Sequence, residues 1–256
     1  MAMTWYWIGF LAADGCVSDD GDLYLRLAQR DLGHIEALRA FVGAGEPGTA
    51  AGRIAGPHKG CYCLSLRSRR ITADLERLGG ITPRKTQTYT PTARAAAQRA
   101  FWLGMLDGDG TAYWHKNNRW GTQTPEVIWT GSHAAMAACW AFWSAQLPNE
   151  RIAPPRALKS QHLWEVRLWA RAAPLAAQIL LSACKRSLPR KRSKLQAIAQ
   201  HPMRTPVRLT RSCTWCGTDV QRYPSQARTP HSFCSREHYL AWWRASGSAL
   251  RIRTVA

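Results

Sequence analysis

Short stretches of alternating hydrophobic and polar side chains are separated by segments with helical spacing in the first part of the chain. Residues 23–27 alternate strictly and predict a half-buried strand, and further strands are predicted around 53–55 and over 62–67. Apolar residues recur with helical spacing at about 33–42 and 71–78. The pattern therefore predicts paired strands that alternate with helices.

The second part of the chain repeats this order. Strands are predicted over 126–130 and 164–168, and a helix over 172–183. Another helix is predicted between the two strands, because four apolar side chains at positions i, i+3, i+4 and i+7 share one helical face. These are Met136, Cys139, Trp140 and Trp143. Each part is thus expected to run helix, hairpin, helix, hairpin, helix.

Each part begins with an apolar segment that ends in Asp-Gly, and the two segments align without a gap. Residues 7–15 are Trp-Ile-Gly-Phe-Leu-Ala-Ala-Asp-Gly, and residues 102–110, which start 95 positions later, are Trp-Leu-Gly-Met-Leu-Asp-Gly-Asp-Gly. A repeat of this length predicts two copies of a small domain related by pseudo-twofold symmetry.

Small side chains recur at a spacing of four in both segments, as Gly9 and Ala13 in the first and Gly104 and Gly108 in the second. Residues four apart lie on one face of a helix. Two such helices would therefore be able to pack with their backbones almost in contact.

Packing of this kind would place Asp14 and Asp109 side by side at the ends of two helices. A carboxylate at a helix C-terminus faces the negative end of the dipole and costs about 0.3–1 kcal/mol, and two neighbouring carboxylates repel each other further. A divalent cation would offset both costs. Paired carboxylates beside a scissile phosphate form the type of Mg²⁺ site used in phosphodiester hydrolysis. We therefore predict Mg²⁺, or another divalent cation, at these acids.

The composition agrees with a folded protein that binds DNA. Hydrophobic residues make up 46% of the chain, with 13 tryptophans, which excludes a disordered chain. There are 35 Lys and Arg against 16 Asp and Glu, a formal net charge of +19, and duplex DNA is the polyanion that such a charge favours. Charge alone leaves a ribosome-associated or a membrane-surface protein open.

No membrane-spanning segment or secretory signal is expected. The longest apolar run, residues 5–13, is too short to span a bilayer, and no basic region precedes it. We therefore expect a cytoplasmic, DNA-associated protein whose eight cysteines are thiols or metal ligands.

The two Asp-Gly segments resemble the signature motif of the LAGLIDADG homing endonucleases, and the resemblance covers about residues 4–200. The second half of the motif matches both segments, and its final acid, which binds the catalytic metals in the family, falls on Asp14 and Asp109. The first copy has Ala12 where an earlier aspartate is common, whereas the second keeps that residue as Asp107. Because the earlier acid is not the metal ligand in the family, the prediction is unchanged.

The resemblance implies an α+β fold of two αββαββα units, whose antiparallel sheets form a saddle over the major groove of double-stranded DNA. It also implies a monomeric endonuclease that cuts both strands of a long, asymmetric target and leaves 3′ overhangs. The predicted Mg²⁺ ligands are Asp14 and Asp109, together with the residues before them, Ala13 and Gly108.

A basic residue often assists near the active site in this family. Lys85 and Lys191 lie in similar Pro-Arg-Lys sequences after the last helix of each copy and are the candidates for contact with phosphate or water. The alternative is that both are solvated linker lysines. Residues 185–211 carry nine basic residues and no acid, which favours phosphate contact there, although such a run is often a solvated face.

Side chains on the open face of each sheet are expected to contact DNA. If Leu23, Leu25 and Leu27 face the helices, the positions between them face the groove. Arginine contacts to guanine edges would each contribute about 1–3 kcal/mol of discrimination. The alternative is an exposed strand face without this role. The predicted DNA-contacting residues are Tyr24, Arg26, Arg30, Cys63, Ser65, Arg67, Glu165, Arg167, Arg190 and Arg192.

The C-terminal part contains a candidate Zn²⁺ site. Cys213 and Cys216 form a C-x₂-C pair, and Cys234 and His238 follow as a second close pair. This is the spacing of a tetrahedral structural zinc site, and the segment resembles treble-clef zinc fingers. Metal binding would supply much of the folding energy of so short a tail, and its basic character suggests additional DNA contact. Unmetallated thiols are the alternative.

These inferences divide the chain into five parts: residues 1–84 (first repeat), 85–98 (linker), 99–188 (second repeat), 189–205 (basic helix or linker) and 206–256 (zinc-finger-like domain). Besides the endonuclease, two other functions remain open. One is a nucleic-acid binder on the same scaffold without cleavage, either an RNA maturase or a DNA-binding regulator. The other is a zinc-finger interaction protein. No splicing residues frame the domain, so a free-standing or intron-encoded protein is expected rather than an intein.

Overall fold

The computed structural model divides the chain into two units, residues 1–202 and 203–256, and each unit is described by itself. None of the helices within the described ranges is both long and apolar enough to cross a membrane. The described ranges are 1–43, 51–85, 88–117, 122–158, 163–202, 209–222 and 229–246.

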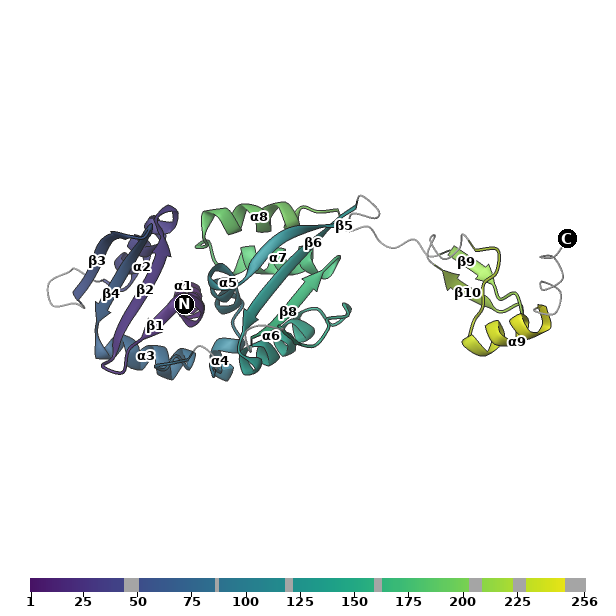
Figure 1. The fold of residues 1–256 in the computed structure, drawn as a ribbon, viewed down its shortest axis with the longest axis horizontal. Helices are drawn as coiled ribbons and strands as arrows, with labels where there is room; N and C mark the ends of the chain where they lie inside the picture. Colours follow the sequence, from purple (N-terminus) through teal and green to yellow (C-terminus); the bar gives the residue numbers. More distant parts are fainter. Residues whose placement is uncertain are drawn as a thin grey trace. The chain divides into compact units, whose positions relative to one another are not determined.

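The first repeat consists of a long helix, two strands, a second helix, two further strands and a third helix (Figure 1). Its four strands form one antiparallel sheet in the order β1-β2-β4-β3. The elements are α1 (Ala2–Asp14), β1 (Gly15–Val17), β2 (Asp22–Ala28), the 3₁₀ turn η1 (Gln29–Asp31), α2 (Leu32–Phe41), β3 (Ala51–His58), β4 (Cys61–Arg67) and α3 (Arg69–Gly79).

The second repeat has the same order of elements, and its sheet order β5-β6-β8-β7 corresponds to that of the first. The predicted pair of αββαββα units is therefore confirmed. The elements are α5 (Arg99–Gly108), β5 (Thr111–Asn117), β6 (Thr122–Gly131), α6 (His133–Gln146), β7 (Arg156–Ala157), β8 (Trp164–Trp169) and α7 (Ala172–Ala183). The short helix α4 (Ala93–Ala96) precedes this repeat, and α8 (Pro189–Ala199) follows it.

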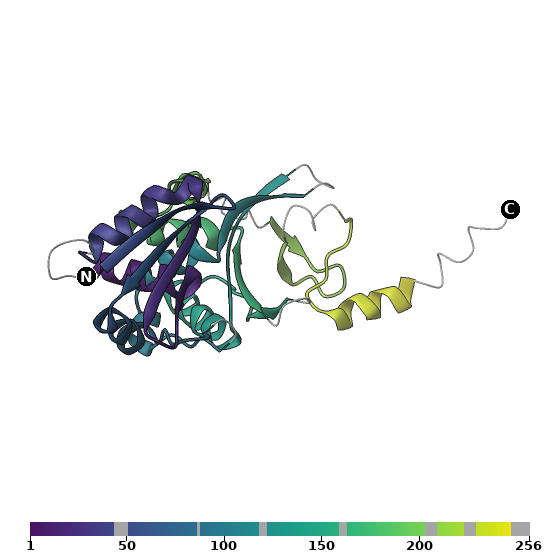
Figure 2. The same cartoon turned by 60° about the vertical axis from the view of Figure 1, so that its left-hand side comes forward.

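Alternate side chains of the strands point to opposite faces of each sheet, as the sequence pattern predicts. Leu23, Leu25 and Leu27 are buried, whereas Tyr24 and Arg26 between them are exposed. The buried faces pack on helices, and Figure 2 shows the strands of the first sheet lying over α1. No described helix of residues 1–202 covers the opposite face of either sheet.

The two repeats meet where α1 crosses α5, and the helices approach so closely that only glycine fits at the contact. A Cβ added to Gly104 would overlap the carbonyl oxygen of Tyr6 and lie 2.6 Å from the nitrogen of Phe10. A Cβ added to Gly9 would likewise overlap the carbonyl oxygen of Phe101. The close packing predicted from the small residues is thus present, and one hydrophobic core continues through both repeats.

The second unit is a small hairpin followed by a helix. Strands β9 (Leu209–Ser212) and β10 (Asp219–Arg222) pair antiparallel, and α9 covers Arg236–Ser246. Among its described residues only Cys213 and Ser232 are buried. So small a core contributes little stability, which makes a metal or another crosslink the expected source of order.

Candidate functional site

The ends of the two crossing helices bring Asp14 and Asp109 next to each other. Asp14 is the last residue of α1, and Asp109 is the C-cap of α5. Between them Gly108 packs against Ala13, and a Cβ on Gly108 would overlap the side chain of Ala13 and lie 3.4 Å from Cγ of Asp14. The absence of a side chain at position 108 therefore allows the two acids to emerge beside one another.

The surroundings of these acids oppose their ionisation. Burial and, to a smaller extent, the negative charge of Asp109 raise the pKa of Asp14 to about 6, against the lowering effect of nearby basic groups. The pKa of Asp109 is also raised, mainly by desolvation, although its side chain remains open to solvent on one side. Ionised carboxylates held in this way would be stabilised by a cation.

Lys85 lies against the end of the first motif helix. The residue is only 7% exposed, and Nζ donates to the carbonyl oxygen of Ala12 at 2.6 Å and to that of Ala13 at 3.4 Å. A positive charge at this place interacts favourably with the negative end of the helix dipole. The structure therefore excludes the alternative of a solvated linker lysine.

Lys191, at the start of α8, makes the equivalent contact with the second motif helix. It contacts more carbonyl oxygens there than Lys85 does on the first motif helix. The residue is also 7% exposed, and burial lowers the pKa of its ammonium group to about 8. Four carbonyl oxygens at and just after the end of α5 lie within hydrogen-bonding distance of Nζ and share its three N–H groups. They belong to Leu106 (2.8 Å), Asp107 (2.6 Å), Gly108 (2.8 Å) and Gly110 (2.8 Å).

The charges of the two lysines act across the repeats. Among the basic groups, Lys85 lowers the pKa of Asp109 most, and Lys191 lowers the pKa of Asp14 most. Each lysine thus holds the backbone of its own repeat and mainly balances the acid of the other. The sequence identified the four residues but not this crossed arrangement.

Asp107 lies apart from the acid pair and has a structural role. It is fully buried, and its Oδ2 accepts hydrogen bonds from the hydroxyl of Tyr6 at 2.7 Å and from the backbone nitrogen of Leu188 at 2.8 Å. Because the hydroxyl proton goes to Asp107, Tyr6 accepts from Nε2 of His34, at 2.9 Å. This chain of contacts links the first repeat to the residue before α8.

A cavity of about 330 Å³ opens beside the acids. It is lined on one side by the ends of the motif helices, with Ala13, Lys85 and Asp109, and on the other by the end of β6, with Thr130 and Gly131. Asp109 is therefore accessible to a ligand from the side of the second sheet, next to the end of the first motif helix.

The open face of the first sheet carries most of the residues predicted there. Register places Tyr24 opposite Ser65 and Arg26 opposite Cys63 on this face, and Arg67 is paired with Asp22 at 3.4 Å but remains exposed. Arg53 on β3 is exposed and lies opposite Ser65, on the edge of β4 that faces away from β2. The sequence did not predict this residue as a DNA contact, because 53–55 was predicted only as a strand.

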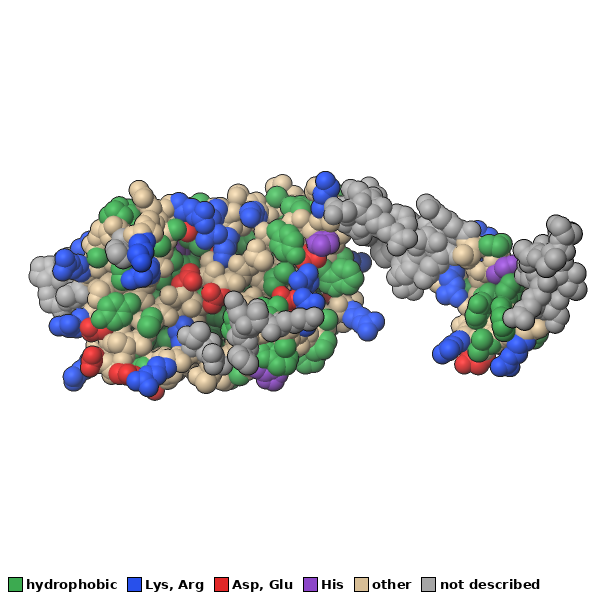
Figure 3. Space-filling model, in the orientation of Figure 1, with side chains coloured by type: hydrophobic (Ala, Val, Ile, Leu, Met, Phe, Trp, Pro, Cys, Tyr) green, Lys and Arg blue, Asp and Glu red, His purple; other side chains and the backbone are tan. Residues whose placement is uncertain are grey.

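Of the three predicted arginines near the junction of the repeats, two bond to protein groups. Arg30 is exposed on η1, whereas Arg190 pairs with Asp31 at 3.3 Å and Arg192 donates to the carbonyl oxygen of Cys184 at 3.2 Å. Figure 3 shows acidic side chains in the middle of the open face, with basic side chains around them.

On the open face of the second sheet, Glu165 and Arg167 bond to each other. Glu165 is 8% exposed, so the carboxylate is less accessible than alternation alone predicted. Nη2 of Arg167 lies 3.2 Å from Oε1 of Glu165, and Nη1 of the same arginine lies 2.9 Å from Oε2 of Glu126 on the neighbouring strand.

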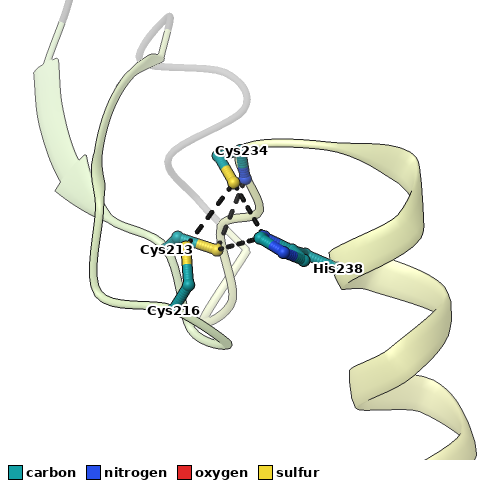
Figure 4. A group of neighbouring side chains, drawn as sticks. All are labelled: Cys213, Cys216, Cys234 and His238. Carbon is teal, nitrogen blue, oxygen red and sulfur yellow. Dashed lines mark hydrogen bonds between the residues drawn. The ribbon is translucent and has the colours of Figure 1, made fainter.

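The four residues predicted to bind zinc come together in the second unit (Figure 4). Their ligand atoms all lie within 4.8 Å of one another, and no other group of three or more His, Cys, Asp or Glu with this property occurs in the described parts of the chain. The Sγ atoms of Cys216 and Cys234 are 3.6 Å apart, and Nδ1 of His238 lies 3.9 Å from Sγ of Cys213.

The backbone around Cys213 favours the thiolate form of this residue. Burial raises the pKa of Cys213, but N–H groups of Cys216, Cys234 and Trp215 outweigh burial and bring the pKa down to about 6. The thiolate is the form of cysteine that binds metals. All eight cysteines of the chain are free of disulfides.

No protein-family model matches the sequence, and no curated protein matches it. Solved structures do match. A double mutant of I-SmaMI superposes with a TM-score of 0.53 at 10% identity, covering 77% of this chain and 89% of that one. A single mutant of the same protein gives a TM-score of 0.51 at 10% identity, with coverage of 77% and 89%. I-SmaMI, a meganuclease, bound to uncleavable DNA gives 0.50 at 11% identity, with coverage of 77% and 87%.

I-SmaMI is a LAGLIDADG homing endonuclease. At identities of 10–11% the likeness concerns the fold, and it agrees with the two αββαββα units and the antiparallel sheets described above. The chain has the LAGLIDADG fold.

Proposed function

We propose that this protein is a site-specific endonuclease that makes a metal-dependent double-strand break in a long, asymmetric DNA target and leaves 3′ overhangs. The observation that carries the proposal is the pair Asp14 and Asp109 at the adjoining ends of two helices. Desolvation raises the pKa of both carboxyl groups, and the charge of Asp109 adds to the increase at Asp14. An acid pair that costs stability, with Asp109 open to a cavity and with Lys85, Lys191 and Arg190 close enough to lower the pKa, is the expected form of a site for metal and phosphate.

The donor atoms at this place suit Mg²⁺. Carboxylate oxygens of Asp14 and Asp109 and backbone oxygens of Ala13 and Gly108 form an all-oxygen set, which hard divalent cations prefer. Bound there, Mg²⁺ would supply an activated water and neutralise charge on the leaving oxygen. Lys85 and Lys191 hold the ends of the helices and keep positive charge close to the scissile phosphates.

Double-stranded DNA is the proposed substrate, with the open faces of the two sheets in its major groove. The sequence carries an excess of 19 positive charges, which supports binding to the phosphate backbone. The solved structure of I-SmaMI with uncleavable DNA provides a precedent on the same fold. The residues proposed to contact DNA are Tyr24, Arg26, Arg30, Cys63, Ser65, Arg67, Glu165, Arg167, Arg190 and Arg192.

For the second unit we propose a structural Zn²⁺ held by Cys213, Cys216, Cys234 and His238. Tetrahedral zinc with bonds of about 2.3 Å to sulfur separates its sulfur ligands by about 3.8 Å, close to the 3.6 Å between Cys216 and Cys234. The unit would add DNA contact, which its nine arginines against two acids over 203–256 support.

The deciding experiment is selection of cleaved molecules from a randomised duplex library in Mg²⁺, with the full chain as a monomer. Wild type should enrich one asymmetric site. Asp14→Asn and Asp109→Asn should each lose cleavage of one or both strands while still binding the selected duplex. Asp20→Asn, at an exposed acid in the turn between β1 and β2, is the matched control and should cut like wild type. Normal cleavage by both Asp14→Asn and Asp109→Asn would refute the proposed metal site.

A further inference from the structure

The open face of the second sheet carries a connected group of ionic and hydrogen-bonding side chains at its centre. Arg167 on β8 bonds Glu126 on β6 through Nη1 at 2.9 Å and Glu165 on its own strand through Nη2 at 3.2 Å. Glu165 also accepts from Arg156 at 2.7 Å, and Glu126 accepts from the hydroxyl of Tyr113 at 2.8 Å. Four strands of the sheet thus contribute to one network.

This network holds the guanidinium of Arg167 in a single place. The carboxylate side chains are 7% exposed at Glu126 and 9% at Glu165, so water competes weakly for their oxygens. The side chain of Arg167 is 35% exposed and therefore still reaches the open face. A long side chain loses much rotamer freedom when it binds a ligand. Here that freedom is already reduced before any ligand arrives.

The charges within the network cancel, since it contains two arginines and two glutamates. The first sheet differs, because Arg26 and Arg53 are exposed on its open face and have no acidic partner among the described residues. Because the network has no net charge, it attracts a phosphate less strongly than arginines without an acidic partner do. The centre of the second face is therefore less suited to nonspecific backbone contact than the first face.

We propose that Arg167 reads a guanine in the major groove and that Glu126 and Glu165 are positioning residues for it. This inference rests on the proposed binding of duplex DNA. A guanidinium has five N–H donors, and two of them are used in the contacts with the glutamates. The remaining donors suit the O6 and N7 acceptors of guanine, a pairing that requires the planar fork of arginine. Prior ordering by the glutamates lowers the entropic cost of the contact.

The place of Arg167 on its strand also locates the guanine within the target. Glu165 pairs with Thr130, which lines the cavity beside Asp109. Arg167 lies two residues further along β8, which corresponds to about 7 Å. The guanine is therefore expected a few base pairs from the cut, in the half of the site bound by the second repeat.

The test is selection of bound duplexes from a randomised library with the full chain in Ca²⁺, so that binding is measured without requiring cleavage. Arg167→Ala and Arg167→Lys should both reduce the preference for guanine at one position by about ten- to a hundredfold and leave the other positions unchanged. Glu126→Gln should weaken the same preference while raising affinity for unrelated DNA, because it removes a negative charge from the face.

Two comparison variants distinguish recognition of a base by Arg167 from phosphate contact and from loss of stability. Arg26→Ala should weaken binding to all sequences and reduce the slope of log affinity against log salt by about one. Glu150→Gln breaks a comparable ion pair, 2.9 Å from Arg171. It controls for loss of stability and should leave base preference unchanged.

An unchanged base profile in Arg167→Ala and Glu126→Gln would overturn the inference and leave the network a structural feature of the sheet. A uniform loss of affinity at all positions in Arg167→Ala would also overturn it, since that is the behaviour of a phosphate contact. Specific binding by wild type without cleavage in Mg²⁺ would contradict the proposed nuclease activity alone. Absence of any binding to duplex DNA would contradict both.

Discussion

Replacing Gly104 by alanine should destabilise the first unit and separate the two acids. Alanine is the better helix former, by about 1 kcal/mol, so local propensity predicts stabilisation. The structure predicts the opposite, because the new Cβ would overlap the carbonyl oxygen of Tyr6 and lie 2.6 Å from the nitrogen of Phe10. Both obstacles are backbone atoms, which cannot rotate away as a side chain would.

The size of the effect follows from the displacement required. Ordinary contacts of a Cβ begin at 3.4 Å, so α1 and α5 must move apart by about 1 Å. Overpacking of a core costs about 1–3 kcal/mol. We expect a net loss of stability near the upper end of this range, with the gain in helix propensity already included. For a unit of 202 residues this corresponds to a fall in Tm of roughly 5–10 °C. A shift of 1 Å at reacting groups costs about a hundredfold in rate.

The assay is thermal unfolding of the full chain, followed by cleavage of the selected duplex. Gly33→Ala is the matched control, because Gly33 lies in α2 with nothing within 4 Å of its added Cβ. This variant should be as stable as wild type, or more stable by up to about 1 kcal/mol. Gly9→Ala, whose Cβ overlaps the carbonyl oxygen of Phe101, should behave like Gly104→Ala.

The reasoning is refuted if Gly104→Ala and Gly33→Ala melt at the same temperature. It is also refuted if Gly104→Ala is destabilised but cleaves at the wild-type rate, since the helix contact would then not position the acids.

Three further predictions concern buried and metal-binding groups. Lys191→Met should lower the free energy of unfolding in urea more than Lys85→Met does, because Lys191 binds four backbone carbonyls and Lys85 two, and unpaired buried acceptors cost about 1–3 kcal/mol each; equal losses would contradict this. A zinc chelator should make residues 203–256 sensitive to protease while residues 1–202 stay resistant, and Cys216→Ser should do the same without chelator; a tail that remains resistant after measured loss of zinc would be evidence against the site. Burial lowers the pKa of His34 to about 4 from 6.5, so its contribution is fully present above pH 6.5 and is lost as the pH falls toward 4, by about 3 kcal/mol. Urea unfolding at pH 7 and 4.5 should show a smaller decrease for His34→Gln than for wild type, and equal decreases would count against a neutral buried His34.

Much of the fold follows from local patterns. Alternation over 23–27 and 164–168 predicted β2 and β8, and helical spacing predicted α7 with the bounds that the structure has. Periodicity is a property of neighbouring residues, so one sequence suffices to detect it. Strands β1 and β7 did not stand out, because they contain only three and two residues and depend on pairing with longer strands.

The repeat of the Asp-Gly segment identified Asp14 and Asp109, and small residues at a spacing of four predicted the close helix contact. Both features can be recognised from neighbouring residues. The second copy of the segment showed that the first copy is not a chance sequence. The same holds for the spacing of Cys213, Cys216, Cys234 and His238, which the structure brings within 4.8 Å.

Only the tertiary structure decided what the remaining polar residues do. Lys191 lies in a basic run typical of a solvated face, yet it is buried on carbonyls more than 80 residues earlier in the chain. Glu126 lies in a predicted strand without a predicted role, and its partner Arg167 is 41 residues away. Burial and pairing of charged groups depend on which distant segments meet, because desolvation is offset only by partners that folding brings together. The sequence alone therefore determined the repeats, the acid pair and the cysteine cluster, whereas tertiary contacts decided the placement of the lysines and the order of the second sheet's open face.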